Sequence, residues 1–387
     1  MSHLASSLFG WQYRARQWVA GRLYRLRHRA VDRATPTEDP NHVLLVIAGH
    51  IGDTVMSTPL IIEARRAWPG ARITVLGQKH NCDLLSACPL VDACEETPTI
   101  PFALRRRRET ARLKVWLREQ KFDVAVMVLG DQFALATAEA GIPIRVGVQG
   151  SLLEPCLTHT YPIVSPRAWG PAERLNALRA LGYDVRNVSP RLWVSPAAVR
   201  TGRRRLERLG LPEETPYVAV HPFGSAVRQW WPVQRVGELA EGLWRRCGWN
   251  TVVIGGPETR GQLPDLTVDS LIDATGALSL PELLAVVENA RLVISTDSGP
   301  FHIAGALGRP LVGLFRARRP EHATRYPQAR VLFGHDPSCD TSCRWDHCQS
   351  APCRQMRALG AAEVLNAVRL AQEGNPASRK RVSQRTN

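Results

Sequence analysis

The chain has 387 residues and a formal charge of +15, so it is too long for one ordinary hydrophobic core and fits two domains of average size. Hydrophobic residues make up 44% of it and charged residues 22%, which excludes the disordered and fibrous classes. No stretch approaches about eighteen consecutive apolar residues, and the arginine-rich first forty residues contain no secretory apolar run, so we expect a cytoplasmic protein without a transmembrane helix.

The large positive charge predicts an anionic partner, which is nucleic acid, a membrane or a phosphorylated substrate. It is concentrated in the first 33 residues, in the run Arg105 to Arg108 and in the tail after Ser378. No signature of a DNA- or RNA-binding module is present, which disfavours nucleic acid as the partner. The run Arg105 to Arg108 suits an acidic substrate, although a solvated helix face explains it at least as well.

Residues 4–30 contain no acidic side chain, and their apolar residues fall on one side of a helical wheel. The stripe consists of Leu4, Leu8, Trp11, Ala15, Trp18, Val19, Leu23, Leu26 and Ala30. Tryptophans flanked by arginines suit a helix that lies in the headgroup region of an anionic membrane. A helix docked on its own protein is an equally good interpretation. Residues 1–40 are therefore expected to form a basic amphipathic helix and a linker.

Apolar runs alternate with helical patterns after the proline-containing linker Thr35 to Asn41. This alternation predicts a doubly wound parallel sheet with helices on both faces, in a Rossmann-like domain over residues 41–195. The predicted strands are His42 to Ala48, Arg72 to Leu76, Asp123 to Leu129 and Arg145 to Val148, and the predicted helices include Pro59 to Trp68 and Arg107 to Gln120.

The same pattern restarts after a polar, proline-marked stretch around Ser189 to Pro216. It predicts a second Rossmann-like domain over residues 196–373, followed by a polar tail, 374–387, that we expect to be disordered. Two such α/β domains predict a cleft, with ligands bound beyond the carboxyl ends of the strands. The predicted elements are strands at Tyr217 to His221, Thr251 to Gly255, Leu271 to Ala274, Arg291 to Ser295 and Leu311 to Phe315, and helices at Val233 to Arg246 and Leu280 to Asn289.

The loop after the first strand contains Gly49, His50, Gly52 and Asp53 and is followed by Thr54 to Pro59 and then a helix. Its glycines allow a tight turn and close approach of another molecule, and they place one carboxylate at the strand end. Asp53 is a candidate general base for that reason. Taken alone, an N-cap for the following helix is the commoner role of an aspartate at such a position.

In the second domain, the strand Arg291 to Ser295 is followed by Thr296 and the run Asp297, Ser298, Gly299, Pro300, Phe301 and His302. Asp297 or Ser298 is suited to cap a helix with Pro300 in its first turn, and unpaired N–H groups at such a helix start attract phosphate. Gly299 leaves room for an oxygen, and His302 is placed to donate to the same anion. A capped helix with a buried histidine explains each residue singly but not the whole cluster.

Two further strand-end loops of this domain suit a nucleotide diphosphate. Gly224 and Ser225 allow a backbone turn near an anion, and Arg228 supplies a fixed positive charge. Glu258 follows the next strand and is suited to accept hydrogen bonds from a ribose. The chain contains no Asp-x-Asp pair, no phosphate loop of the ATPase type and no Gly-x-Gly-x-x-Gly after its first strand, which weakens metal-bridged, ATP-hydrolysing and dehydrogenase interpretations.

The nine cysteines show no evenly spaced framework, so a disulfide scaffold is not expected in a reducing compartment, and free thiols or a metal site remain. Cys339, Cys343, Cys348 and Cys353 lie close together in sequence, and a structural zinc site is one interpretation of them. An unmetallated loop is at least as good an interpretation.

Three of these segments resemble the signatures of glycosyltransferase family nine, the ADP-heptose:lipopolysaccharide heptosyltransferases. They are His50 to Pro59 with the following Ala67 to Ala71, the stretch His221 to Pro232, and the run Asp297 to Ala304. The resemblance covers most of residues 42–316. The family often has a lysine two residues before a Trp-Pro pair, where this chain has Gln229.

The resemblance implies a GT-B fold, with the acceptor bound by the first domain and the donor nucleotide by the second. It implies that Asp53 is the general base of an inverting transfer, that Ser298, Gly299 and His302 hold the diphosphate beside Asp297, and that no cofactor is required. The implied partners are a nucleotide-sugar donor, a lipid-linked saccharide acceptor and the inner membrane surface. A transferase using another nucleotide sugar for capsule or glycoprotein, or an inactive sugar-nucleotide-binding module, remains the alternative.

Overall fold

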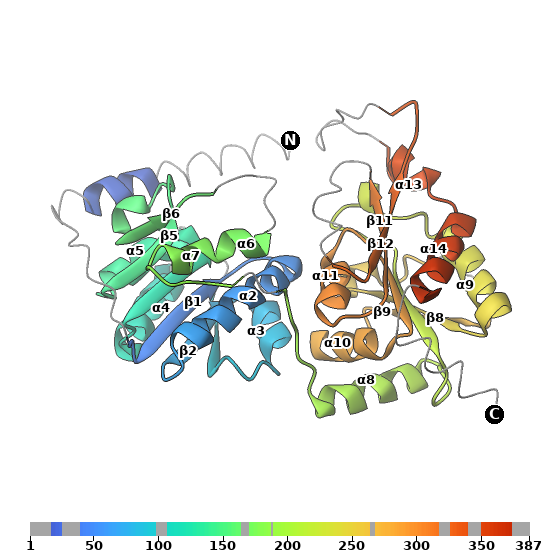
Figure 1. The fold of residues 1–387 in the computed structure, drawn as a ribbon, viewed down its shortest axis with the longest axis horizontal. Helices are drawn as coiled ribbons and strands as arrows, with labels where there is room; N and C mark the ends of the chain where they lie inside the picture. Colours follow the sequence, from blue (N-terminus) through green and yellow to red (C-terminus); the bar gives the residue numbers. More distant parts are fainter. Residues whose placement is uncertain are drawn as a thin grey trace. The chain divides into compact units, whose positions relative to one another are not determined.

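The computed structural model describes residues 17–24, 39–97, 107–163, 170–186, 189–263, 268–316, 326–339 and 350–373. The chain divides into two compact units, and the boundary between them in the sequence lies between Arg191 and Leu192. Each unit alternates strands with helices around its own parallel sheet (Figure 1). The α/β class expected from the sequence is therefore confirmed, and the predicted tail 374–387 lies outside the described residues.

The first unit contains a six-stranded parallel sheet in the order β3-β2-β1-β4-β5-β6. Its strands are β1 (His42–Ile47), β2 (Arg72–Gly77), β3 (Ala93–Glu96), β4 (Val124–Leu129), β5 (Ile144–Val148) and β6 (His159–Tyr161). Its helices are α2 (Ile51–Ala67), α3 (Lys79–Leu85), α4 (Arg107–Gln120), η2 (Asp131–Phe133), α5 (Ala134–Glu139), η3 (Glu154–Cys156), α6 (Gly170–Arg174) and α7 (Asn176–Arg179). The apolar runs correctly predicted β1, β2, β4 and β5, whereas the edge strands β3 and β6 are short and carry no such run.

The second unit has a parallel sheet in the order β12-β11-β10-β7-β8-β9. Its strands are β7 (Tyr217–His221), β8 (Asn250–Gly255), β9 (Leu271–Thr275), β10 (Leu292–Thr296), β11 (Leu311–Arg316) and β12 (Ala329–Gly334). Its helices are α8 (Pro196–Arg208), η4 (Val227–Gln229), α9 (Gln234–Cys247), η5 (Pro257–Thr259), α10 (Leu280–Asn289), α11 (Gly299–Ala306), α13 (Arg354–Ala358) and α14 (Ala361–Glu373). Five strands match the prediction, and the half-buried edge strand β12 was missed.

Helix α2 begins eight residues before the predicted start at Pro59, so Pro59 lies inside the helix. A proline within a helix has no N–H and leaves the carbonyl four residues earlier without its usual donor. That carbonyl belongs to Val55, and the Thr58 hydroxyl donates to it at 2.8 Å. The side chain before the proline thus replaces the missing donor, and α2 continues through it.

Helix α8 lies in the stretch around Ser189 to Pro216 that the sequence analysis treated as a polar separator. Ser195 caps it, because the Ser195 Oγ accepts from the Ala198 N–H at 3.1 Å, and Pro196 occupies the first turn. A Cβ on Gly202 would lie 3.2 Å from the Glu282 carbonyl oxygen of α10, so the two helices pack closely there. The sequence did not predict α8, because several arginines lie on its exposed face and only a narrow side of the helix is buried.

Only residues 17–24 of the predicted N-terminal helix are described, and they are helical. One face packs on the first unit, because Gln17 is buried and a Cβ on Gly21 would lie 2.6 Å from the Leu152 carbonyl oxygen. Trp18, Val19 and Leu23, three members of the predicted stripe, remain about half exposed. The amphipathic helix over residues 4–30 stays a prediction. Among the described residues, no helix is long and apolar enough to cross a membrane.

Within the described residues, the Cys82–Cys94 disulfide joins α3 to β3, with 5.4 Å between the Cα atoms. We expected free thiols or a metal site from the sequence, and that expectation is wrong for this pair. Parallel pairing of β3 with β2 brings Cys94 beside the helix that follows β2. Sequence spacing carries no signal of this proximity.

Candidate functional site

The first strand-to-helix junction runs from the end of β1 to the start of α2. His50 is the N-cap residue, with extended backbone angles, and Asp53 is the third residue of the helix. The Asp53 Oδ2 accepts from the His50 N–H at 3.1 Å, which is the carboxylate half of a capping box. Asp53 is therefore not the N-cap residue, as the simpler interpretation of the sequence had it. It caps the helix from the third helical position. Gly52 lies within the first turn of the helix.

Gly49 fits this junction because it lacks a side chain. A Cβ at Gly49 would lie 2.8 Å from the Asp53 Cβ, a distance that real side chains do not tolerate. The Gly49 carbonyl oxygen accepts from Asn81 Nδ2 at 2.9 Å and lies 2.8 Å from His80 Nε2. The start of α3 thus fixes the loop, a contribution from Asn81 and His80 that the sequence analysis did not identify.

Arg174, at the end of α6, pairs with Asp53. The Arg174 Nη2 donates to the Asp53 Oδ1 at 3.0 Å and Nη1 donates to the Asp53 main-chain oxygen at 2.5 Å. The arginine side chain is 9% exposed, whereas that of Asp53 is 31% exposed. The carboxylate is thus anchored from within the first unit and still reaches solvent.

The second junction runs from β10 to α11. Ser298 is the N-cap residue by its backbone angles, but its side chain makes no cap hydrogen bond, which corrects the expectation of a side-chain cap there. Its Oγ lies 3.0 Å from His221 Nδ1 and 3.1 Å from Ser295 Oγ, and it donates to the Thr296 carbonyl oxygen at 3.1 Å. No acidic residue occupies the first turn of α11. The Ser298 side chain therefore accepts no hydrogen bond from the N–H groups at the positive end of this helix dipole.

Two histidines flank this helix start. His221, the last residue of β7, is buried, and burial lowers its pKa from 6.5 to about 4. The imidazole that contacts Ser298 is therefore neutral near pH 7. His302, in the first turns of α11, is partly buried, and its Nδ1 lies 3.2 Å from the Tyr326 hydroxyl. Asp297, just before the helix, is exposed.

The predicted nucleotide-binding loops lie at the carboxyl ends of three neighbouring strands, because β10 pairs with β7 and β7 with β8. Gly224, Ser225 and Arg228 follow β7, and Glu258 follows β8 as an exposed residue of η5. The Thr296 hydroxyl also donates to the Phe223 carbonyl oxygen, which ties the end of β10 to the loop after β7. The sheet thus brings together, at one edge, the residues expected from the sequence to bind a nucleotide.

The family profile described as "Glycosyltransferase family 9 (heptosyltransferase)" matches residues 110–351. The chain belongs to this family. It is therefore a glycosyltransferase, and the resemblance inferred from its motifs is confirmed.

Relatives and solved structures agree with this assignment. The chain is 26% identical to Lipopolysaccharide heptosyltransferase 3 of Escherichia coli over 69% of this chain and 81% of that protein. It is 27% identical to Lipopolysaccharide heptosyltransferase 1 of Pseudomonas aeruginosa over 82% and 90%. The fold resembles the glycosyl transferase family 9 structure from Veillonella parvula, with a TM-score of 0.71, 19% identity and coverage of 86% of this chain and 97% of that one. It also resembles E. coli ADP-heptose lps heptosyltransferase II, with a TM-score of 0.69, 21% identity and coverage of 85% and 98%.

The Gln229 side chain is used within the loop after β7 of this glycosyltransferase. The Gln229 Oε1 accepts from the Ser225 Oγ at 2.8 Å and from the Ala226 N–H at 3.2 Å. A Cβ on Gly224 would lie 2.6 Å from the Gln229 Cβ. Gln229 therefore closes the turn after β7, and Arg228 is the cationic residue of this loop.

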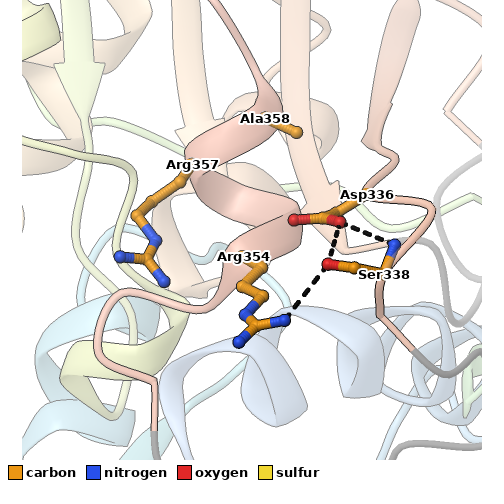
Figure 2. A pocket seen from close by; sticks show the side chains of 5 residues that line it. All are labelled: Asp336, Ser338, Arg354, Arg357 and Ala358. Carbon is orange, nitrogen blue, oxygen red and sulfur yellow. Dashed lines mark hydrogen bonds between the residues drawn. The ribbon is translucent and has the colours of Figure 1, made fainter.

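A pocket of about 330 Å³ lies after β12 and beside α13 (Figure 2). The Asp336 Oδ1 accepts from the Ser338 N–H at 2.8 Å and the Ser338 Oγ at 2.6 Å, and Arg354 donates to that hydroxyl at 3.1 Å. The hydrogen bonds from Ser338 lower the pKa of Asp336. Arg357 and Ala358 complete the lining, so the pocket contains none of the predicted site residues.

Two of the four clustered cysteines are described. Cys339 is partly exposed and Cys353 is buried, whereas Cys343 and Cys348 lie outside the described residues. Within the described part of the chain, no group of three or more His, Cys, Asp or Glu side chains is arranged to hold a metal ion. A zinc site formed by all four cysteines stays a prediction.

Proposed function

We propose that this glycosyltransferase transfers a heptose, or a related sugar, from an ADP-sugar to a lipopolysaccharide-core-type glycolipid with inversion at the anomeric carbon. The partly exposed Asp53 carboxylate, held at the carboxyl end of the first sheet by Arg174 and the His50 N–H, carries the proposal. Relatives named as lipopolysaccharide heptosyltransferases support the sugar and acceptor class.

Asp53 is proposed as the general base, with His50 and Gly52 bordering the acceptor. As the acceptor hydroxyl attacks the anomeric carbon, its proton passes to the Asp53 carboxylate and the bond to the diphosphate breaks from the opposite face. The nucleoside diphosphate leaves with the bonding electrons. The proton ends on Asp53, the sugar on the acceptor oxygen and the bonding electrons on the diphosphate, so the step needs no cofactor.

The second unit is proposed to bind the donor. The start of α11, with Ser298, Gly299 and His302 beside Asp297, offers N–H groups and an imidazole to the diphosphate. Arg228 supplies the cation, Gly224 and Ser225 the turn beside it, and Glu258 a hydrogen-bond acceptor for the ribose. The neighbouring positions of β10, β7 and β8 support this grouping.

The donor sugar and nucleotide are tested by gene deletion followed by mass spectrometry of the lipopolysaccharide. Loss of a heptose from the core is expected, and release of ADP from ADP-heptose by the purified protein would accompany it. The alternative is a family member that uses another nucleotide sugar, which the Gln229 departure favours. An unchanged glycolipid together with turnover of a UDP- or GDP-sugar would establish that alternative.

A peripheral position on the inner membrane is proposed from the helix at residues 17–24. The half-exposed Trp18, Val19 and Leu23 suit insertion at headgroup depth, and the Arg22 guanidinium lies 4.5 Å from the Trp18 ring centroid, placed to meet anionic lipid. Deleting the helix would also uncover the surface that Gly21 packs against, so substitutions are the cleaner test.

Sedimentation with vesicles of phosphatidylglycerol and phosphatidylcholine provides the measurement. The double variant Trp18→Ala, Leu23→Ala should lose most vesicle binding. Trp244→Ala is the matched control, because Trp244 lies on α9 and is 51% exposed, against 49% for Trp18. Equal binding by wild type and the double variant would show that residues 17–24 serve only to pack on the first unit.

A further inference from the structure

Arg174 is a buried cation that forms an ion pair with the carboxylate of the proposed base. Burial lowers the pKa of the Arg174 guanidinium, and the charge of Asp53 opposes that shift. A buried charge without a partner is strongly unfavourable, so the ion pair and hydrogen bonds with Asp53 help to stabilise the arginine where it lies. The same contact therefore holds the Asp53 carboxylate in one place.

The carboxylate is also fixed in orientation. Oδ1 receives the Arg174 hydrogen bond and Oδ2 receives the His50 N–H, so both oxygens are directed. The Asp53 Cβ rests against Gly49, where no side chain intervenes. The Arg174 hydrogen bond to the Asp53 main-chain oxygen further joins the start of α2 to α6. Each oxygen keeps a second lone-pair direction, and the exposed side of the group is open to an incoming hydroxyl.

We propose that Arg174 is a positioning residue for the transfer, which holds the Asp53 carboxylate aimed at the acceptor hydroxyl. This inference rests on the proposed role of Asp53 as the base. A base held in place before the substrate arrives needs little reorganisation during the reaction, and small displacements of such a group are costly in rate. In the transfer the acceptor proton moves to the carboxylate, and Arg174 neither gains nor loses a proton.

A purely structural role for Arg174 is the competing explanation, and the first unit offers a matched comparison. Arg145 is also a buried arginine, and burial likewise lowers its pKa. Its guanidinium donates to the carbonyl oxygens of Cys156 at 2.7 Å, of Pro143 at 3.3 Å and of Ile142. Because its guanidinium donates to these backbone oxygens and not to Asp53, replacing Arg145 should lower stability without changing the chemistry of folded molecules.

The experiment compares Arg174→Met, Arg174→Lys and Arg145→Met in the full chain, with kcat, the KM for ADP-heptose and thermal melting measured for each. We expect Arg174→Met to lower kcat roughly tenfold to a hundredfold with the donor KM changed less than about twofold. Arg174→Lys should retain more activity, because it keeps the charge but loses the two-atom fork. Arg145→Met should lower the melting temperature and leave kcat per folded molecule unchanged.

A double-mutant cycle separates this inference from the function on which it rests. In an Asp53→Asn background the base is gone, so adding Arg174→Met should change the residual kcat by less than about twofold. If Asp53→Asn collapses turnover but Arg174→Met keeps wild-type kcat, the positioning role is overturned and the base survives. If Asp53→Asn itself keeps wild-type turnover, the proposed function fails. If Arg174→Met does not fold, Arg174→Lys decides: a lowered kcat at unchanged donor KM supports positioning, and a wild-type kcat overturns it.

Discussion

In both units the third strand from one edge of the sheet runs through a short loop into a helix: β1 into α2, and β10 into α11. At the first junction a carboxylate from the third helical residue returns to the N-cap backbone and is paired with a buried arginine. At the second junction the N-cap hydroxyl turns away from the helix toward a neutral histidine. One junction therefore presents a negative group, and the other presents the positive end of a helix dipole.

This difference shows how one topology supports two tasks. A carboxylate at a strand end is suited to remove a proton, whereas a helix start without a capping side chain is suited to receive a phosphate. The choice depends on which side chains occupy the first helical turn and which buried partners hold them. Fold similarity alone does not assign these tasks, so each junction is tested separately.

The largest effect is expected from removing the negative group of the first junction. In Asp53→Asn the amide oxygen still accepts from the His50 N–H, but the side chain no longer takes up a proton. We expect kcat to fall by roughly a hundredfold to ten-thousandfold, while the affinity for ADP, measured by calorimetry, stays close to wild type.

Asp123→Asn is the matched control for that substitution. Asp123 Oδ2 accepts from the N–H groups of Asn41 and His42, at 2.7 and 3.0 Å, and so lies at the opposite end of β1. Asparagine preserves both contacts, and turnover should remain near wild type. Near-normal turnover in Asp53→Asn would remove the functional distinction between the two junctions.

The sequence predicted the buried parts of both units well, since continuous apolar runs mark strands that have neighbours on both sides. The bounds of β7, α4 and α10 were reproduced to the residue. Short edge strands escaped prediction because they are only partly buried, as in β3, whose residues are all intermediate or exposed. The start of α2 was misplaced because a proline usually ends a helix, and the compensating Thr58 hydroxyl becomes visible only in three dimensions.

The site was predictable one loop at a time, but its supporting contacts were not. Asp53 and Ser298 attracted attention through their positions after apolar runs. Arg174 lies 121 residues from Asp53 and His221 lies 77 residues from Ser298, and no spacing rule connects such pairs. These contacts arise from the packing of α6 on α2 and of β7 beside β10.

The next largest effect concerns His221, the neutral histidine of the second junction. Burial lowers its pKa from 6.5 to about 4, so between these values the unfolded chain binds a proton that the folded chain does not. The contribution of His221 to the free energy of unfolding is fully present above about pH 6.5. It is lost as the pH falls toward 4, by at most about 3 kcal/mol. Burial also lowers the pKa of His42 in the first unit, although its hydrogen bond to the Gln120 carbonyl opposes this shift.

Urea unfolding between pH 4.5 and 7.5 measures this dependence, with the wild type compared against His221→Asn. Asparagine does not titrate, so the difference between the two curves isolates His221 from His42 and the other groups. We expect the wild type to lose more stability on acidification than the variant. Parallel curves would show that His221 binds a proton as readily in the folded protein as in the unfolded chain, which would overturn the lowered pKa of this histidine.

The smallest of these effects distinguishes two side chains of the second junction. His302→Ala should weaken ADP binding by about 2 kcal/mol, roughly thirtyfold, because one charge-assisted hydrogen bond to the diphosphate is lost. Ser298→Ala should weaken it less, since the Ser298 hydroxyl already contacts His221, Ser295 and the Thr296 carbonyl, and backbone N–H groups remain at the helix start. Calorimetric titration with ADP measures both variants. A loss for Ser298→Ala as large as that for His302→Ala would mean that the hydroxyl leaves His221 to bind the nucleotide. Unchanged affinity in both would place the nucleotide away from α11 and leave the positive helix end without its proposed ligand.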